Sequence, residues 1–252
     1  MSSLTQRWPR RISWSGVPAR APSGRPQDVL SRARERWFRP PSAYWSPELY
    51  EQYFAGPRLG ARLRRGDDRI VHAELERLLA PQDEVLEVGA GTGHYTVTLA
   101  RRCARVTALD AAPEMAGYLR RRVAREGLGN VEAGIGRLPD AVGPSGPFDG
   151  VVCLGVLGYV DDLDAGLRAL VERLSPGGWM LVSLPPLTLE GRVHGLVELV
   201  GRRRVRLRSP AAAVAAANRA GLIVEAEARA GLTAGGITLL LAARRRAGGG
   251  PG

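Results

Sequence analysis

The sequence predicts an α/β fold with a doubly wound, mostly parallel sheet of seven strands. Short apolar runs bounded by turn residues alternate with longer segments of helical period, which is the pattern of parallel strands joined by helices. The first run, Val85–Val88, is β-branched and stops at Gly89, which favours a buried strand over a helix. A glycine cluster and the start of a helix follow, so the carboxyl end of this strand is the expected ligand site.

The other elements follow in chain order. We expect further strands at 104–109, in 131–139, at 148–154, up to Val182, at 222–226 and at 237–243. We expect helices at 69–79, from the glycine loop to Cys103, from Ala111, at 163–174 with Asp161 or Asp162 as its cap, and at 211–220. The segment from Pro185 to Arg208 is expected to be irregular and to form a wall of the acceptor pocket.

The glycine loop predicts the chemistry of the ligand. Its spacing, Gly89-x-Gly91-x-Gly93, differs from the G-x-G-x-x-G of a dinucleotide site. Glu87 puts a carboxylate at the mouth of the loop, where it would repel a pyrophosphate and suit a cation. Asp110 ends the second strand, where an acid can accept hydrogen bonds from both ribose hydroxyls. The ligand implied has a ribose and a positive group but no phosphate.

With these motifs the chain resembles the class I S-adenosylmethionine-dependent methyltransferases, which have a Rossmann-like fold. The resemblance covers roughly residues 70–245 and includes the glycine loop, Asp110, the fourth-strand segment 148–155 and the Ser175-Pro176-Gly177-Gly178 turn into the fifth strand. It implies that S-adenosylmethionine is the cofactor. The implied cofactor-binding residues are Glu87, Gly89, Ala90, Gly91, Gly93, Asp110, Ala111, Met115, Ile135, Gly136, Leu154 and Tyr53.

The adenine end departs from the family pattern. Many relatives carry an acid after the third strand that accepts a hydrogen bond from the adenine amino group, whereas this sequence has Gly134-Ile135-Gly136. A backbone amide of Ile135 or Gly136, with apolar contact from Ile135, is the remaining way to hold the ring, and Asp140 is a further candidate. The small Ala111 leaves room for a flat base, and Met115 would lie near the adenine edge.

Four regions are expected along the chain. Residues 1–40 form a basic Pro/Arg-rich arm expected to be disordered, and residues 41–68 form a cap or lid helix, with Ser46 and Pro47 at its start. By resemblance Tyr50 or Tyr53 of this cap would close over the sulphonium. Residues 69–245 are the methyltransferase catalytic domain and 246–252 a flexible Gly-rich tail. For the arm three roles stay open: none, a contact with nucleic acid or a partner through its tryptophans, or a mitochondrial transit peptide.

Composition limits the cellular locations and the binding partners that are expected for this chain. The net charge of +11 is concentrated in the arm and in arginine runs near 202–208 and 244–246, so the expected catalytic core is not basic. No apolar run has the length of a membrane span and no signal-peptide core is visible, so no membrane partner is expected. Cys103 and Cys153 read as buried thiols, which favours a cytoplasmic location. The oligomeric state is left open.

The expected activity is methyl transfer to an oxygen or nitrogen of a small-molecule acceptor, within secondary metabolism. His194 is the candidate general base because it lies in the acceptor segment, and His94 is expected to flank the cofactor. The Asn/Asp-Pro-Pro-aromatic motif of enzymes that methylate base amino groups is absent, and no Cys or His cluster has metal spacing. Two alternatives stay open: an RNA or other nucleic-acid methyltransferase that uses the basic arm, and a non-catalytic module that binds S-adenosylmethionine.

Overall fold

A computed structural model describes residues 47–48, 50–51, 59–140, 142–200, 204–231, 236 and 238–246. The chain divides into two units, residues 1–38 and 39–252, and everything described lies in the second. Three expectations therefore fall outside the described residues: the basic arm, Tyr53 of the cap and the tail after Arg246. Residues 47, 48, 50 and 51 are helical, at the place where the cap helix is expected.

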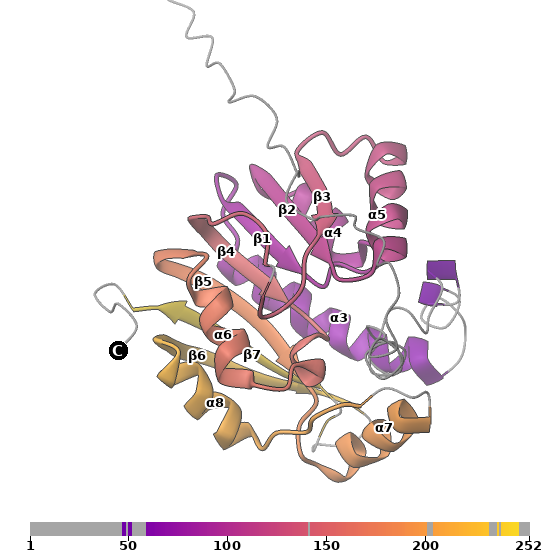
Figure 1. The fold of residues 1–252 in the computed structure, drawn as a ribbon, viewed down its shortest axis with the longest axis vertical. Helices are drawn as coiled ribbons and strands as arrows, with labels where there is room; N and C mark the ends of the chain where they lie inside the picture. The colour runs from indigo at the N-terminus through magenta and orange to yellow at the C-terminus, as the bar shows by residue number, and fades with distance from the viewer. Residues whose placement is uncertain are drawn as a thin grey trace, which may run out of the picture. The chain divides into compact units, whose positions relative to one another are not determined.

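Seven strands form one sheet, as predicted (Figure 1). In chain order they are β1 Glu84–Val88, β2 Arg105–Asp110, β3 Val131–Ile135, β4 Phe148–Cys153, β5 Leu174–Leu184, β6 Leu222–Ala230 and β7 Thr238–Arg245. Their spatial order is β3-β2-β1-β4-β5-β7-β6. Only β7 runs against its neighbours, so the sheet is mostly parallel and doubly wound.

Helices cover both faces of the sheet (Figure 1). Helices α3 (Leu59–Leu78), α4 (His94–Ala100) and α5 (Pro113–Arg125) share one apolar cluster, and α6 (Leu163–Val171) and α8 (Pro210–Arg219) share the other. Side chains along a strand alternate between the faces, so Val85 packs with the first cluster and Leu86 with the second. Nearly every side chain of the central strands is buried on both sides, as a parallel sheet requires.

The structure corrects several element boundaries. The segment from Pro185 to Arg208 is not irregular throughout, because it contains the helix α7 (Leu189–Val200). Helix α3 begins at Leu59 rather than at residue 69, so the boundary drawn at 68/69 falls within one helix. Helix α6 ends at Val171, and β5 begins at Leu174, where the helix was expected to end. Asp162 is the cap of α6, since its side chain accepts a hydrogen bond from the Ala165 amide at 3.0 Å.

Candidate active site

The candidate site lies at the carboxyl ends of β1, β2 and β4. The loop after β1 leads to α4 on one face of the sheet, and the loop after β4 passes through the 3-10 turn η2 (Leu157–Tyr159) to α6 on the other face. Loops that leave neighbouring strands toward opposite faces open a crevice between them, and this is where doubly wound sheets bind ligands. The predicted glycine loop is therefore at the topological switch point.

The backbone amides of the glycine loop point into the protein. Gly89 and Ala90 both donate to the Leu109 carbonyl, at 2.7 and 2.9 Å, and Gly93 donates to the Ala90 carbonyl at 2.9 Å. Gly91 donates to Asp110 Oδ2 at 2.8 Å. In a phosphate-binding loop these groups would face the ligand. Here they are already bonded within the protein.

Asp110 holds the loop in this conformation. Its second carboxylate oxygen, Oδ1, accepts a hydrogen bond from the Ala112 amide at 2.9 Å, so the side chain joins the glycine loop to the start of α5. Burial raises the pKa of Asp110 above its ordinary value, and the backbone amides that it accepts from act in the opposite direction. Each carboxylate oxygen has a second lone pair, which leaves acceptor capacity for the predicted ribose hydroxyls.

Glu87 is buried beneath the loop, on the face of the sheet that carries α4. It is 4% exposed, and Thr96 Oγ1 of α4 donates to its Oε2 at 2.5 Å. Burial raises the pKa of Glu87 to about 7; the Thr96 hydrogen bond lowers it and the nearby Asp110 carboxylate raises it. The carboxylate predicted at the mouth of the loop is thus a desolvated acid, and a cation placed beside it would stabilise its charged form.

The residues predicted to contact the adenine lie at the end of β3 and the start of α5. Ile135, at the end of β3 beside Asp110, leaves 49% of its surface exposed, so its side chain is accessible to a flat ring. The Gly136 amide, however, donates to the Asp110 carbonyl at 3.1 Å, so of the two predicted amides only that of Ile135 is a candidate for the ring. Met115 is 2% exposed within the core, while Ala111 is half-buried.

Two residues near the carboxyl end of β4, Val156 and Ser183, were not predicted from the sequence to belong to the site. A Cβ on Gly89 would overlap Val156 Cγ2 and lie 3.9 Å from the Leu154 carbonyl oxygen, so Gly89 is needed for close approach as well as for its φ of 82°. Ser183, at the end of β5, accepts from the Gly155 amide through its hydroxyl oxygen at 2.9 Å. No local sequence motif predicts either contact, because each contact joins the ends of two strands that are far apart in the sequence.

The helical residues of the cap region contact the glycine loop. Thr92 Oγ1 donates to a carboxylate oxygen of Glu51. Arg122 of α5 donates to the Thr92 carbonyl at 3.1 Å, and its guanidinium lies 3.8 Å from the same Glu51 carboxylate. Tyr50, beside Glu51, is half-buried. These contacts place Glu51 of the predicted cap region against the loop, whereas the sequence analysis pointed to the tyrosines of the cap.

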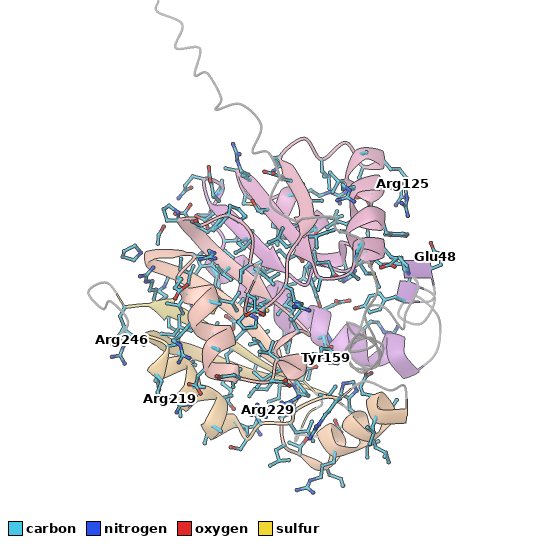
Figure 2. All side chains as sticks on the ribbon, viewed as in Figure 1. Glu48, Arg125, Tyr159, Arg219, Arg229 and Arg246 are labelled. Carbon is cyan, nitrogen blue, oxygen red and sulfur yellow. The ribbon has the colours of Figure 1, made fainter. Side chains whose placement is uncertain are left out.

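The two histidines of interest lie in different surroundings. His94, the first residue of α4, contacts Asp68 Oδ1 through Nε2 at 2.9 Å, and Tyr95 donates to the same oxygen at 2.9 Å. His194 is half-buried on α7, one turn before Glu198. Tyr159 of η2 donates to Glu198 at 3.2 Å, so this face of α7 packs on the segment after β4, and Figure 2 labels Tyr159 there.

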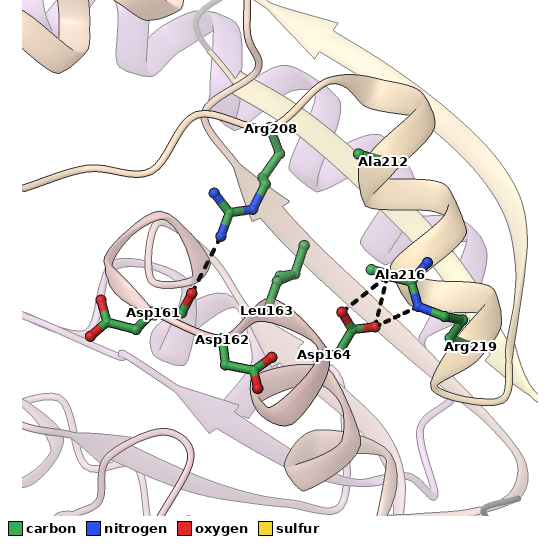
Figure 3. Close-up of a pocket in the computed structure, with 8 residues that line it drawn as sticks. All are labelled: Asp161, Asp162, Leu163, Asp164, Arg208, Ala212, Ala216 and Arg219. Atoms are coloured by element: carbon green, nitrogen blue, oxygen red, sulfur yellow. Dashed lines mark hydrogen bonds and ion pairs between the residues drawn. The ribbon is translucent and has the colours of Figure 1, made fainter.

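A separate shallow pocket of about 350 Å³ lies between α6 and α8 (Figure 3). Arg219 forms two hydrogen bonds with Asp164, at 2.9 and 3.0 Å, and Arg208 donates to the Asp161 carbonyl at 3.4 Å. None of the glycine-loop residues lines it. Because it shares no lining residue with the glycine loop, this pocket is separate from the candidate site.

Both cysteines are free and buried, as predicted. Burial raises the pKa of Cys103 to about 11 and places that of Cys153 far above its usual range, so neither thiol is a ready nucleophile. Within the described ranges, no three His, Cys, Asp or Glu side chains gather as a metal site would require. The same part of the chain has no helix with the length and apolarity to cross a membrane.

Comparison with known proteins agrees with this geometry. Residues 85–178 match a family described as "Methyltransferase domain". The chain is 37% identical over 100 residues to a "Ubiquinone biosynthesis O-methyltransferase" of Xanthomonas axonopodis pv. citri, covering 39% of this chain and 41% of the relative. It is 37% identical over 106 residues to the protein of that name in Xylella fastidiosa, covering 42% and 43%. The chain thus spans about two fifths of the length of these curated relatives.

Solved structures share the fold. The magnesium protoporphyrin IX methyltransferase of Synechocystis PCC 6803, solved with bound S-adenosylhomocysteine, has a TM-score of 0.64 at 19% identity, over 86% of this chain and 99% of that one. Mitomycin 7-O-methyltransferase has a TM-score of 0.62 at 19% identity, over 84% and 60%. At such identities the likeness concerns the fold alone.

Proposed function

We propose that this chain, a member of the class I S-adenosylmethionine-dependent methyltransferases, transfers a methyl group from S-adenosylmethionine to an oxygen atom of a small molecule. The family rests on the sequence match of residues 85–178 together with the sheet order and its single antiparallel strand. Oxygen is preferred over the nitrogen alternative because the curated relatives carry the name O-methyltransferase. The reducing cytoplasm remains the proposed location.

One observation carries the proposal: four amides of the glycine loop, those of Gly89, Ala90, Gly91 and Gly93, donate within the protein and not toward a ligand. Its amides end on the Leu109 carbonyl, the Ala90 carbonyl and the Asp110 carboxylate. Two buried acids, Glu87 and Asp110, lie beneath and beside it. Such a surface suits a ribose and a cation and disfavours a phosphate. The residues present therefore fit S-adenosylmethionine better than they fit a dinucleotide.

Different residues would bind the ribose, the adenine and the ammonium end of the cofactor. Asp110 would accept hydrogen bonds from the ribose hydroxyls, the exposed Ile135 would contact the adenine, and the Leu154 carbonyl together with Glu87 would face the ammonium end. When bound, the cofactor supplies an electrophilic methyl group on a positively charged sulphur. The protein's task is then to hold the acceptor atom in line with that methyl group and to exclude water.

An acceptor hydroxyl must also lose its proton. We propose His194 as the group that takes it, since α7 packs on η2 at the carboxyl end of β4. His94 is the second candidate; its contact with Asp68 would hold the ring in one orientation.

The test has two stages. Calorimetric titration with S-adenosylhomocysteine should show micromolar binding, and absence of binding at high concentration would overturn the proposal. Radiolabelled S-adenosylmethionine is then offered with hydroxylated aromatics, matched amines and RNA. Label on hydroxylated compounds supports the proposal, label on amines moves the acceptor atom to nitrogen, and label on RNA alone would replace the small-molecule acceptor. Binding without transfer to any of them would favour a non-catalytic module.

A further inference from the structure

Helix α7 exposes its apolar side and turns its acidic residues inward. Five of its apolar residues are more than half exposed: Leu189 at 80%, Val193 at 58%, Leu196 at 62%, Val197 at 57% and Leu199 at 60%. At about 100° per residue they occupy one side of the helix. A surface helix normally shows the opposite arrangement. We call this side, with the exposed Arg192 that falls within it, the outer face of α7.

The inner face fixes this orientation. Glu198 is 8% exposed and accepts a hydrogen bond from Tyr159. The glycines of α7 also lie inward: a Cβ on Gly191 would overlap the Pro186 carbonyl oxygen, and a Cβ on Gly195 would contact Leu207 at 3.8 Å. Two glycines allow this side of the helix to approach the body of the protein closely. The helix therefore cannot rotate to bury its leucines and valines without breaking these contacts.

Charge indicates what the outer face meets. Arg192 is the one exposed residue with a charged side chain on the outer face of α7. Glu190 is half-buried, and Glu198 is buried on the opposite side of the helix. In the sequence Arg202, Arg203 and Arg204 follow the helix, but among the described residues the charge on the outer face itself is that of Arg192. A helix that combines an apolar face with a cationic residue and no exposed acid matches the surface of a bilayer with anionic lipids.

A second copy of this chain is a poorer match. A twofold contact through the outer face would bury the exposed Arg192 of each copy in the contact, with no exposed acid of the helix to offset its charge. A bilayer offers hydrocarbon for the leucines and phosphates for Arg192 at once.

We propose that α7 docks on the surface of an anionic bilayer, with its outer face inserted at the level of the headgroups. No described helix crosses a membrane, so this is attachment in the plane of the interface and goes beyond the expectation that a membrane plays no part. α7 follows β5 at the carboxyl edge of the sheet and lies at the margin of the described structure in Figure 1. Docking would bring the candidate active site next to lipid, where an apolar acceptor concentrates. The surface itself does not depend on the proposed activity.

The test is sedimentation of the full chain with phosphatidylcholine vesicles, with and without phosphatidylglycerol. The chain should bind the anionic vesicles, and a Val193→Gln/Leu196→Gln double variant should bind them on the order of tenfold more weakly, because two apolar side chains no longer enter the lipid. The matched control is Ile223→Gln on β6, which is 51% exposed and should bind as the unaltered chain does. Both substitutions are at exposed sites, and an unchanged melting temperature checks that each variant is folded.

Three results would overturn the proposal. The first is no binding to anionic vesicles. The second is equal binding by the chain and the double variant, which would assign the attraction to other arginines such as those of residues 1–40. The third is a dimer in solution that the double variant dissociates without any change in vesicle binding, which would make the outer face a contact between copies. None of these measurements needs cofactor or turnover, so failure here leaves the proposed activity to its own test.

Discussion

Cofactor binding is expected to release a proton from Glu87. The pKa of Glu87 is raised from 4.5 to about 7, so near neutral pH a large fraction of the free protein carries a proton on this buried acid. A cation beside the carboxylate favours the charged form and lowers its pKa again. Binding below pH 7 must therefore expel up to one proton, and affinity should rise with pH by up to tenfold per unit until it levels off near pH 7.

The assay is calorimetric titration with S-adenosylhomocysteine in pairs of buffers that differ in ionisation enthalpy. At pH 6 the difference in observed binding enthalpy between the two buffers should correspond to the release of close to one proton. At pH 8 it should correspond to the release of almost none. Glu87→Gln should bind more weakly but with affinity independent of pH across this window. The matched control is Glu84→Gln, an exposed acid on the same strand, which should keep the pH dependence. A flat affinity between pH 5.5 and 8, with no proton released, would refute the reasoning.

The same pKa predicts how folding stability depends on pH. Between pH 4.5 and about 7 the folded protein holds a proton on Glu87 that the unfolded chain has lost, so the free energy of unfolding falls as pH rises through this window and is level above it. The difference between the two pKa values corresponds to about 3 kcal/mol. Glu87→Gln keeps an acceptor for Thr96 and should remove this decline, which urea unfolding at pH 5 and pH 8 would measure.

Three further outcomes are expected. Gly89→Val should abolish binding of S-adenosylhomocysteine, because the new side chain would overlap Val156 and φ is 82°, whereas Gly129→Ala, in open space, should bind normally. Asp162→Ala should lower the free energy of unfolding by about 1 kcal/mol through loss of the α6 cap, seen as a melting temperature lower by a few degrees; an unchanged value would mean the cap contributes nothing. His194→Ala should reduce turnover by about a hundredfold while leaving cofactor affinity unchanged, and full turnover would remove His194 as the base.

Much of the fold could be predicted because each strand is a short apolar run with a turn residue at its end. The exceptions are α7 and the first turns of α3, where glycines interrupt the sequence of a helix. The α7 sequence has apolar residues at helical spacing, but its two glycines lower the helix propensity, and the segment was expected to be irregular. The first turns of α3 are rich in arginine and glycine and lack an apolar stripe.

The site was predictable in its residue types and not in its contacts. Glycine spacing and the two acids indicated the ligand class, since each is a local feature of sequence. The hydrogen bonds of Asp110 to loop amides, the overlap that keeps Gly89 free of a side chain beside Val156, and the contact of Glu51 with Thr92 all join distant segments. Their formation depends on strand register, which the pattern of apolar residues does not specify for strands buried on both faces.

The class of ligand depends on the backbone of the loop more than on any one side chain. Two loop amides end on the Leu109 carbonyl and that of Gly91 ends on Asp110, so the end of β2 determines where these donors point. A neutral or cationic residue in place of Glu87 would leave the same amides engaged, and an incoming phosphate would still find too few donors. If the proposed cofactor binds here, Glu87 would set its affinity and the pH dependence of that affinity, whereas binding of a dinucleotide would require a different path of the chain between β1 and α4.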